Sequence, residues 1–281
     1  MVFMNEVPLV KFDSLAAFDG LIHAISTRHG GVSSGYLSSL NLGKTVGDDP
    51  ENVEINHRRL AEALGVRRDH FTTTWQVHSQ RVLEATKEHR GTLIDQADAI
   101  ITNQVDLPLT QRFGDCTPIL IYDPSHHAVG LAHAGWRGTV AGMAGSLVQA
   151  MIAHYGSDPE ELAAVVGPAI GPCCYEVGDE VVDAVRQAFP DTAPVLRASC
   201  HSSSEDQSGV EAGKHNPGSN GHASRLHFDL WEANRWQLAQ AGVRQIEVAC
   251  VCTSCRRDLY FSHRGDHGRT GRFGAVVMLK G

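Results

Sequence analysis

The sequence lacks any long, uninterrupted apolar run. Its 281 residues are 42% hydrophobic, with a mean hydropathy of −0.18, and nothing in them is typical of a membrane-spanning helix. The first fifteen residues carry Glu6, Lys11 and Asp13 where the apolar core of a signal peptide would have to lie. We therefore expect no membrane partner and no export, which predicts a cytoplasmic protein.

Basic residues are also fewer than acidic residues. The chain has 24 Lys and Arg against 32 Asp and Glu, which gives a formal net charge of −8. Broad binding to nucleic acid or to anionic membranes requires a basic surface, so neither partner is expected. The seven Cys are an odd number in a chain long enough to bury a sizeable core, which argues against a disulfide framework and indicates a reducing compartment.

Three residues far apart in the chain have the donor types of a metal site. They are His78 in Trp-Gln-Val-His, Cys116 in Gly-Asp-Cys-Thr-Pro and His133 in Ala-His-Ala-Gly-Trp-Arg-Gly-Thr. Two imidazoles and one thiolate suit a zinc-type ion, and a free fourth position would make the site catalytic rather than structural. No short zinc-finger spacing links the three, so an ordinary buried Cys and two hydrogen-bonded His remain the alternative.

The surroundings of these residues favour the metal site. Residues 118–122 follow Cys116 and residues 128–131 precede His133, and both runs are typical of short buried strands. Apolar residues then repeat at helical spacing as far as Met151, so residues 135–139 are predicted to form a tight turn that opens a helix. The free N–H groups of such a turn, with Arg137 beside them, predict a seat for an anion.

Short apolar strands alternate with helical patterns along the rest of the chain. Strands are predicted at residues 21–26, 71–74, 81–85, 99–102, 163–166, 246–250 and 275–279, and helices at 51–64, 139–153, 179–188 and 230–241. This mixture predicts a mixed α/β (α+β) fold, and no linker divides residues 1–281 into separate domains. Residues 198–224 are rich in Ser, Gly, Asn and His, and they are predicted to form a flexible insertion loop.

Several motifs resemble one family, in the same order, along nearly the whole chain. They are the three segments above together with residues 26–33, 39–43, 46–50, 167–172 and 270–272. On these motifs the chain resembles the laccase-domain family, whose members are also described as multicopper polyphenol oxidases or YfiH-like proteins. The resemblance implies one domain built as a layered sandwich of mixed β-sheets and helices, and a zinc site at His78, Cys116 and His133.

The resemblance also implies an enzyme that acts on purine nucleosides. Members of the family are regarded as purine nucleoside phosphorylases that also deaminate adenosine, so the implied substrates are adenosine, inosine or guanosine, methylthioadenosine and phosphate. One Zn²⁺ per chain is expected, with Cu²⁺ as an alternative metal. The implied catalytic residues are His78, Cys116, His133 and Arg137, and the implied substrate or phosphate contacts are Arg28, His29, Asn41, Arg137 and Arg264.

True laccase chemistry is not expected. Multicopper oxidases hold a type 1 copper and a trinuclear cluster through His-x-His and His-Cys-His motifs, which the 16 His of this chain do not form. Two other functions remain open, namely an enzyme that edits peptidoglycan precursors carrying the wrong amino acid and a metal-binding regulatory protein without turnover. The sequence is compatible with either a monomer or a homodimer.

Three departures from the family pattern concern positions around the expected site. Family members often have Ala-Asp-Cys-Leu-Pro around the Cys, Arg at the position of His57, and Tyr-Arg-Arg-Asp where this chain has His263-Arg264-Gly265-Asp266. The three metal residues are retained. The departures therefore bear on substrate or phosphate contacts near His57 and Gly265.

Two further groups of cysteines compete with the expected site. Cys250, Cys252 and Cys255 would form most of a structural zinc site if His263 were the fourth ligand. The alternation of the first two favours small buried side chains at the end of a strand instead. The adjacent Cys173 and Cys174 lack the spacing and the His-x-Glu partner of cytidine-type zinc deaminases, so any deaminase activity is expected to use another zinc scaffold.

Overall fold

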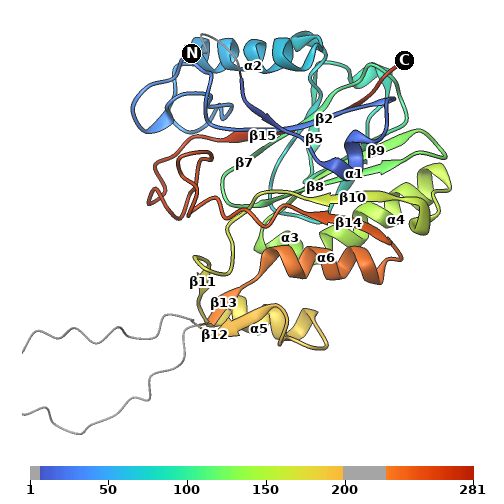
Figure 1. The fold of residues 1–281 in the computed structure, drawn as a ribbon, viewed down its shortest axis with the longest axis vertical. Coiled ribbons are helices and arrows are strands. Elements are labelled where there is room, and N and C mark those ends of the chain that lie inside the picture. Colours follow the sequence, from blue (N-terminus) through green and yellow to red (C-terminus); the bar gives the residue numbers. More distant parts are fainter. Residues whose placement is uncertain (1–6, 199–225) are drawn as a thin grey trace, which may run out of the picture.

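Two β-sheets pack face to face at the centre of the molecule (Figure 1). The computed structural model describes residues 7–198 and 226–281. Within them, an antiparallel sheet has the strand order β1 (Leu9–Val10), β2 (Leu21–Ser26), β15 (Phe273–Leu279) and β7 (Leu109–Phe113). The second sheet has the order β14 (Gln245–Val248), β10 (Ala163–Val166), β8 (Thr117–Asp123), β9 (Ala128–Ala134), β6 (Ala99–Thr102) and β4 (Val82–Glu84). It is mixed, because β14 and β4 at its two edges pair in parallel with their neighbours while the inner pairs are antiparallel.

Helices cover the outer faces of both sheets. Helix α2 (Pro50–Leu64) lies on the four-stranded sheet, and α4 (Met143–Tyr155) and α6 (Leu230–Gln240) lie on the six-stranded sheet (Figure 1). A smaller layer joins α5 (Asp179–Ala188) to the sheet β11 (Glu176–Val177), β13 (Leu226–Phe228) and β12 (Leu196–Ala198). The other elements are α1 (Asp13–Ala16), α3 (Trp136–Val140), β3 (Thr73–Trp75), β5 (Leu93–Gln96) and the 3₁₀ turns Gly35–Leu37, Arg68–His70, Lys87–His89 and Pro159–Glu161.

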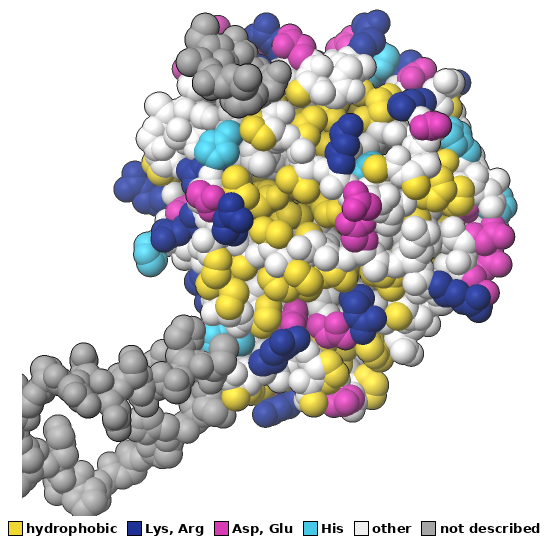
Figure 2. All heavy atoms as spheres, in the orientation of Figure 1, with side chains coloured by type: hydrophobic (Ala, Val, Ile, Leu, Met, Phe, Trp, Pro, Cys, Tyr) yellow, Lys and Arg dark blue, Asp and Glu magenta, His cyan; other side chains and the backbone are white. Residues whose placement is uncertain are grey.

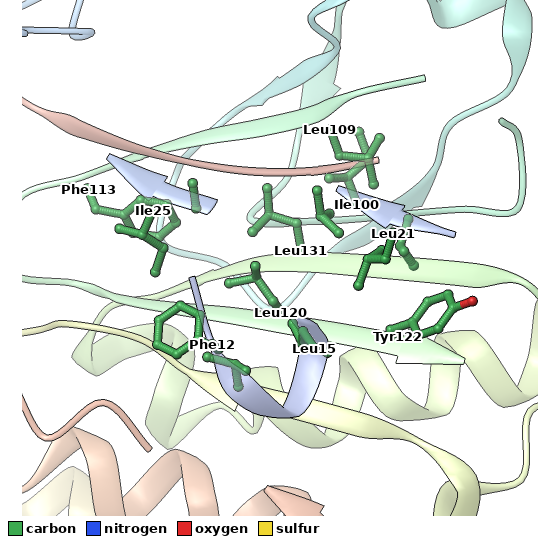
Figure 3. Packing of buried hydrophobic residues seen from close by; sticks show 14 of the residues in the cluster. Phe12, Leu15, Leu21, Ile25, Ile100, Leu109, Phe113, Leu120, Tyr122 and Leu131 are labelled. Atoms are coloured by element: carbon green, nitrogen blue, oxygen red, sulfur yellow. The ribbon is translucent and has the colours of Figure 1, made fainter. Parts of the chain in front are cut away.

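The alternation of side chains along the central strands explains the layers. In β8, Leu120 and Tyr122 point into the core between the two sheets (Figure 3), whereas Ile119 and Ile121 pack against the helices on the other side. Because both faces are covered, all seven residues of β8 are buried, which is why the sequence shows a nearly continuous apolar run. The chain is a single mixed α/β domain, as predicted.

Most of the predicted elements are present. The strands at residues 21–26, 99–102 and 163–166 and the helix at 179–188 have the bounds that were predicted. Helix α2 also begins where its sequence signals it, because Asp49 accepts a hydrogen bond from the N–H of Glu51 and Pro50 occupies the first turn. The chain then leaves the helix through Gly65, which has a φ of 68°.

One predicted helix is wrong. Residues 139–153 do not form a single helix, because α3 ends at Val140 and α4 begins at Met143. Gly142 divides them with a φ of 90°, a left-handed conformation that cannot continue a right-handed helix. Residues 136–139, predicted as a turn, are already part of α3. The predicted flexible loop at 198–224 lies outside the described residues, apart from Ala198 at the end of β12.

The surface shows no separation of charge on the face drawn in Figure 2. Basic and acidic side chains are interspersed there among hydrophobic and neutral ones. In residues 7–198 and 226–281, no helix combines the length and the apolar character that a membrane span requires.

Candidate active site

The pairing of three strands brings the predicted metal residues to one end of the six-stranded sheet. The β8–β9 hairpin sets Pro118 opposite His133, so Cys116, two residues earlier in the chain, emerges at the same end. Strand β6 pairs with β9 in a register that sets Ala99 opposite Ala132, which places Asp98 beside His133. His78 reaches this end from the segment between β3 and β4.

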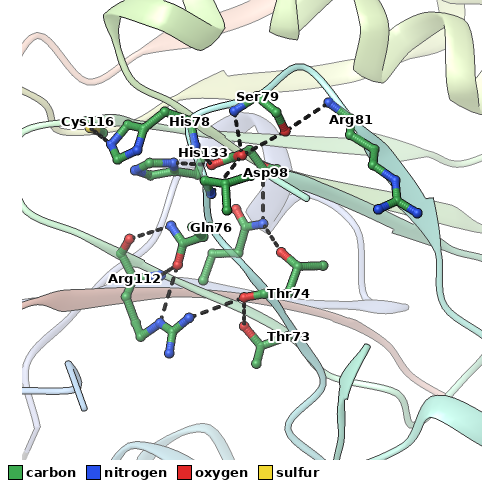
Figure 4. Close-up of polar contacts among 12 residues, drawn as sticks. Thr73, Thr74, Gln76, His78, Ser79, Arg81, Asp98, Arg112, Cys116 and His133 are labelled. Atoms are coloured by element: carbon green, nitrogen blue, oxygen red, sulfur yellow. Dashed lines mark hydrogen bonds and ion pairs between the residues drawn. The ribbon is translucent and has the colours of Figure 1, made fainter. Parts of the chain in front are cut away.

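The three donors converge as the sequence predicted. One ligand atom from each of His78, Cys116 and His133 lies within 4.8 Å of the others, and Cys116 Sγ is 4.0 Å from His78 Nε2. The two imidazole rings meet edge to face at 5.0 Å between centroids. Figure 4 shows the three side chains directed toward one another. Two nitrogens and one sulfur at these separations fit a zinc-type ion with one position left free.

Close packing around the donors explains a glycine in the adjacent motif. A Cβ atom on Gly135 would lie 2.9 Å from His78 Cδ2 and 3.0 Å from Cys116 Sγ. The backbone of Gly135 has a φ of −74°, which any residue adopts, so the requirement is for space and not for conformation. Gly135 therefore lets the backbone approach the side chains of His78 and Cys116.

Asp98 is the functional residue that sequence analysis missed. Its buried carboxylate accepts hydrogen bonds from His133 Nδ1 at 2.9 Å, from the Ser79 hydroxyl at 2.9 Å and from three successive backbone N–H groups, those of Val77, His78 and Ser79 (Figure 4). The bond to Nδ1 leaves Nε2 of His133 as the free ring nitrogen, which is the usual way a carboxylate orients a histidine ligand. The three N–H bonds hold His78 in the left-handed region, at a φ of 62°.

The electrostatics of the cluster are set by its own members. Burial opposes ionisation of the Cys116 thiol, but the neighbouring His133 and His78 outweigh it and lower the pKa of Cys116 to about 6. Burial likewise opposes ionisation of Asp98, yet its bonds from His133 and the backbone lower its pKa to about 2. Burial opposes protonation of His133, but Cys116 and Asp98 outweigh it and raise the pKa of His133 to about 9. Without a metal the cluster therefore favours a thiolate, a carboxylate and a protonated His133, and a metal that binds His133 would displace that proton.

The donors open into a cavity of about 890 Å³. Its walls are strongly basic although the chain as a whole is acidic, since Asp115 is the one acidic residue among the described lining residues. The aromatic and aliphatic side chains Phe71, Trp75, Trp136, Tyr175, Ile170 and Leu230 provide apolar wall. The basic lining residues are Lys44, Arg68, Arg112, Arg137, Arg264 and Arg272.

Two of these arginines are held in place by neutral partners. Arg112 donates to the Thr74 carbonyl and the Gln76 side chain, and Arg272 donates to the carbonyls of Thr270 and Gly271. Neither guanidinium is paired with a carboxylate of the described residues. Burial is the main reason that the pKa of both is lowered, and their mutual repulsion adds to the shift at Arg112. Two adjoining, partly desolvated cations in one cavity wall form a site that an anion would stabilise.

The predicted anion contacts Arg137 and Arg264 also line the cavity, but each has partners already. Arg137 stacks 4.1 Å from the ring centroid of Trp136 and pairs with Glu180 at 3.2 Å. Arg264 lies 5.3 Å from the ring centroid of Tyr175 and donates to the backbone carbonyl of Glu176. Both therefore belong to the wall, and the Arg137 side chain is 57% exposed at its edge.

The other predicted contacts lie outside the group of described residues that line the cavity. Arg28 donates to the carbonyls of Ser38 and Arg257 and stacks on Phe261, and His29 bonds to the Asp258 carbonyl. Asn41 is fully buried. Its amide bonds to Gly43 and Asp48, and its oxygen accepts from the N–H of Arg272 at 2.9 Å. Asn41 thus positions two cavity-lining residues, Gly43 and Arg272.

Of the positions where the chain departs from the family pattern, His57 lines the cavity and Gly265 lies outside the described lining. His57 lines the cavity, and burial is the main reason that its pKa falls to about 3, so its ring is neutral. Its Nε2 bonds to the Leu42 carbonyl, whereas its buried Nδ1 has no partner in the described structure. Gly265 is tightly enclosed, because a Cβ there would lie 2.8 Å from Arg257 Cδ.

Asp115 does not cap its own turn. One carboxylate oxygen accepts from the Thr253 hydroxyl and the other from the N–H of Arg264, both at 2.6 Å. The backbone of Asp115 has a φ of 87°. Its two hydrogen bonds connect the segment beside Cys116 to the C-terminal segments that contain Thr253 and Arg264.

The cysteines outside this site do not form the group considered from sequence. Cys250 and Cys252 both lie beyond the end of β14, and only Cys252 is buried, so the prediction of two small buried side chains on the strand is wrong for Cys250. His263 lines the cavity and is not one of the donors near them. The donors that converge instead are Cys173, Cys174, Cys252 and Cys255.

Known proteins resemble this chain over almost its whole length. Purine nucleoside phosphorylase YlmD of Geobacillus stearothermophilus is 39% identical over 269 residues, which cover 92% of this chain and 90% of that protein. Purine nucleoside phosphorylase of Deinococcus radiodurans is 36% identical and is covered to 93%, with 97% of this chain.

Solved structures show the same fold. YlmD from Geobacillus stearothermophilus has a TM-score of 0.82 and 38% identity, with 94% of this chain and 93% of that chain covered. The Bacillus licheniformis protein YfiH has a TM-score of 0.81 and 34% identity, with 92% and 93% covered. A family model described as multi-copper polyphenol oxidoreductase laccase matches residues 22–280. The chain therefore belongs to this laccase-like family, as its motifs indicated.

Proposed function

We propose that this chain is a metal-dependent purine nucleoside phosphorylase that also deaminates adenosine. The observation that carries the proposal is one cavity in which an incomplete metal-ligand set lies beside two half-buried arginines that form no ion pair with a carboxylate of the described residues. The names of the relatives support the phosphorylase activity. The open ligand set supports the deaminase activity, because zinc deaminases also hold their metal with three protein ligands.

Zinc fits the three donors better than the copper centres of true laccases. A zinc ion held by His78, Cys116 and His133 would supply a Lewis acid with one free coordination position. A type 1 copper site with a trinuclear cluster would need many more His ligands than converge here among the described residues. As a ligand, Cys116 is a thiolate, so it does not serve as the acid that protonates the leaving purine.

Phosphate is proposed to lie against Arg112 and Arg272, with Arg137 and Arg264 closer to the edge of the seat. In phosphorolysis, a phosphate oxygen forms a bond to C1′ of the ribose while the bond from C1′ to the purine nitrogen breaks. The electron pair of that bond leaves with the purine nitrogen, which takes up the proton that the hydrogen phosphate gives up as its oxygen bonds to C1′. The arginines hold the phosphate in position and balance its charge, and the apolar and aromatic wall excludes water from the reacting carbon.

The purine and its sugar are proposed to contact the remaining walls. The neutral ring of His57 lines the cavity and can pack against the substrate. Burial raises the pKa of Tyr175, so its hydroxyl stays protonated and can donate to a purine nitrogen. In deamination, water adds at C6 and ammonia leaves, and no phosphate is required.

One comparative assay tests the proposal. Inosine should give hypoxanthine and ribose 1-phosphate only when phosphate is present, and adenosine should give inosine in its absence. Methylthioadenosine tests tolerance at the 5′ position, and a peptidoglycan precursor with the wrong amino acid tests the editing function. Turnover of that precursor alone would reject the nucleoside proposal, and metal binding without any turnover would favour a regulatory protein.

A further inference from the structure

A second cluster of donors lies outside the cavity lining. Cys173 and Cys174 follow β10, and Cys252 and Cys255 follow β14 about eighty positions later. Their sulfur atoms all lie within 4.8 Å of one another, with Cys255 Sγ 3.5 Å from Cys173 Sγ and 3.4 Å from Cys174 Sγ. All four are free thiols. We call them the four-cysteine cluster.

The backbone builds this cluster from two adjoining turns. β10 and β14 are parallel neighbours, and their pairing continues in a bridge between Ala169 and Cys252. Beyond this bridge each of the two segments forms a turn. The Gly171 carbonyl accepts a hydrogen bond from the N–H of Cys174, and the Cys252 carbonyl accepts one from the N–H of Arg256. Both turns therefore present their cysteines at the same edge of the sheet.

The donor set has the character of a closed metal site. Four sulfurs around a tetrahedral ion at zinc–sulfur bonds of about 2.3 Å would be about 3.8 Å apart, close to the separations observed. The N–H of Gly171 donates to Cys252 Sγ at 3.3 Å, the kind of bond that supports a ligating thiolate. A redox pair needs two thiols, whereas here four converge without forming a disulfide.

We propose that Cys173, Cys174, Cys252 and Cys255 bind a second, structural zinc-type ion that clamps the C-terminal wall of the cavity. The proposal does not depend on which reaction the cavity catalyses. No open position remains for substrate, because all four ligands come from the chain.

The clamp would act on the cavity through the residues next to the cysteines. Tyr175 follows Cys174 directly and lines the cavity, where Arg264 lies over its ring. Thr253 lies between Cys252 and Cys255 and donates to Asp115, the neighbour of Cys116. A metal on the four-cysteine cluster would therefore fix the relative positions of the two turns that support both Tyr175 and Asp115.

Metal counting on the full chain tests the proposal. The wild-type protein, loaded with zinc and dialysed, should carry about two ions per chain by native mass spectrometry and elemental analysis. Cys173→Ser combined with Cys255→Ser should retain about one, and so should His133→Ala, because each variant keeps the other site. Cys250→Ser is the matched control, since Cys250 is exposed and close in sequence but outside the cluster, and it should retain both ions.

A second test begins with thiol alkylation of the wild-type protein, a measurement that does not rely on the folding of a variant, and adds a cobalt spectrum of His133→Ala. With metal bound, the four thiols should resist alkylation, and a chelator should make them react together, as identified by peptide mass spectrometry. Cobalt-loaded His133→Ala should retain strong thiolate-to-cobalt absorption. About one ion per chain in the wild type, with these thiols alkylated at once or joined in disulfides, would overturn the proposal.

Discussion

The two donor clusters lie near each other, since Thr253, between Cys252 and Cys255, donates a hydrogen bond to Asp115 beside Cys116, yet they differ in donor number, donor type and access to the cavity. The histidine-containing cluster, which consists of His78, Cys116 and His133, has donors of mixed type and opens into a basic cavity. Asp98 orients one of its donors, His133. The four-cysteine cluster has four sulfurs and lies outside the described cavity lining. The comparison shows that donor number and access, rather than the presence of Cys and His, indicate where chemistry can occur.

Removal of a candidate ligand from the histidine-containing cluster should have the largest effect on activity. Cys116→Ala or His133→Ala should remove its metal and reduce both phosphorolysis and deamination by more than about 100-fold, which exceeds the usual cost of changing a residue behind the ligands. Steady-state rates with inosine and adenosine, together with metal content and circular dichroism, check this. Full deaminase activity in a folded, metal-free variant would refute the role of the metal.

Arg272→Gln should separate the two reactions. The half-buried guanidinium forms no ion pair with a carboxylate of the described residues, so loss of a charge-assisted bond to phosphate should cost about 1.5–3 kcal/mol, or about 10- to 150-fold in kcat/KM for phosphate. Deamination, which needs no anion, should change much less. Arg272→Lys keeps the charge and should recover part of the loss. Equal losses in both reactions would show instead that Arg272 supports the metal site and does not bind phosphate.

Asp98→Asn should weaken the metal site without removing a ligand. Asparagine keeps the shape of the side chain but loses the negative charge and one acceptor, so metal affinity should fall about 10- to 100-fold. Competition with a coloured chelator measures the affinity. Asp95→Asn is a matched control, because that carboxylate is exposed and pairs only with Arg81 and the adjacent N–H among its described contacts. An unchanged affinity in the Asp98 variant would show that the backbone alone holds the ligands.

The three residues that converge at the candidate metal site could be predicted from sequence, whereas Asp98 behind them could not. His78, Cys116 and His133 have suitable donor types and lie in motifs of the family, and Cys116 and His133 also lie beside apolar runs, so these signals are local. Asp98 has no such signal, since it lies in an ordinary Ala-Asp-Ala-Ile segment. Its role depends on the register between β6 and β9, which places it beside His133.

The other differences between prediction and structure have separate causes. Cys173 and Cys255 lie in separate motifs and are brought together by the parallel pairing of β10 with β14. The helix at 139–153 was predicted as continuous because its apolar spacing extends from Val140 into α4, and the break depends on the backbone conformation of Gly142. Arg112 occurs in a short strand, β7, that the apolar pattern did not reveal.

Gly135→Ala should weaken metal binding by crowding the histidine-containing cluster. The added Cβ would press on His78 and on the Cys116 sulfur, and overpacking of this kind costs about 1 kcal/mol or more, which predicts roughly a 5-fold weaker metal affinity. Gly145→Ala is the control, because that position in α4 has no atom within 4 Å of an added Cβ. Metal affinity equal in the two variants would contradict the close approach.

Arg137→Ala should have the smallest effect, although its motif made it the strongest candidate for phosphate binding in the sequence. The guanidinium is 57% exposed and already pairs with Glu180, so water and an acidic partner reduce what it can offer to phosphate. An exposed ion pair contributes up to about 1 kcal/mol, so KM for phosphate should rise by no more than about 5-fold while deamination is unchanged. The comparison with Arg272→Gln, assayed with inosine over a range of phosphate concentrations, decides which arginines form the seat. A larger loss at Arg137 than at Arg272 would move the phosphate from the buried wall to the edge of the cavity, beside α3.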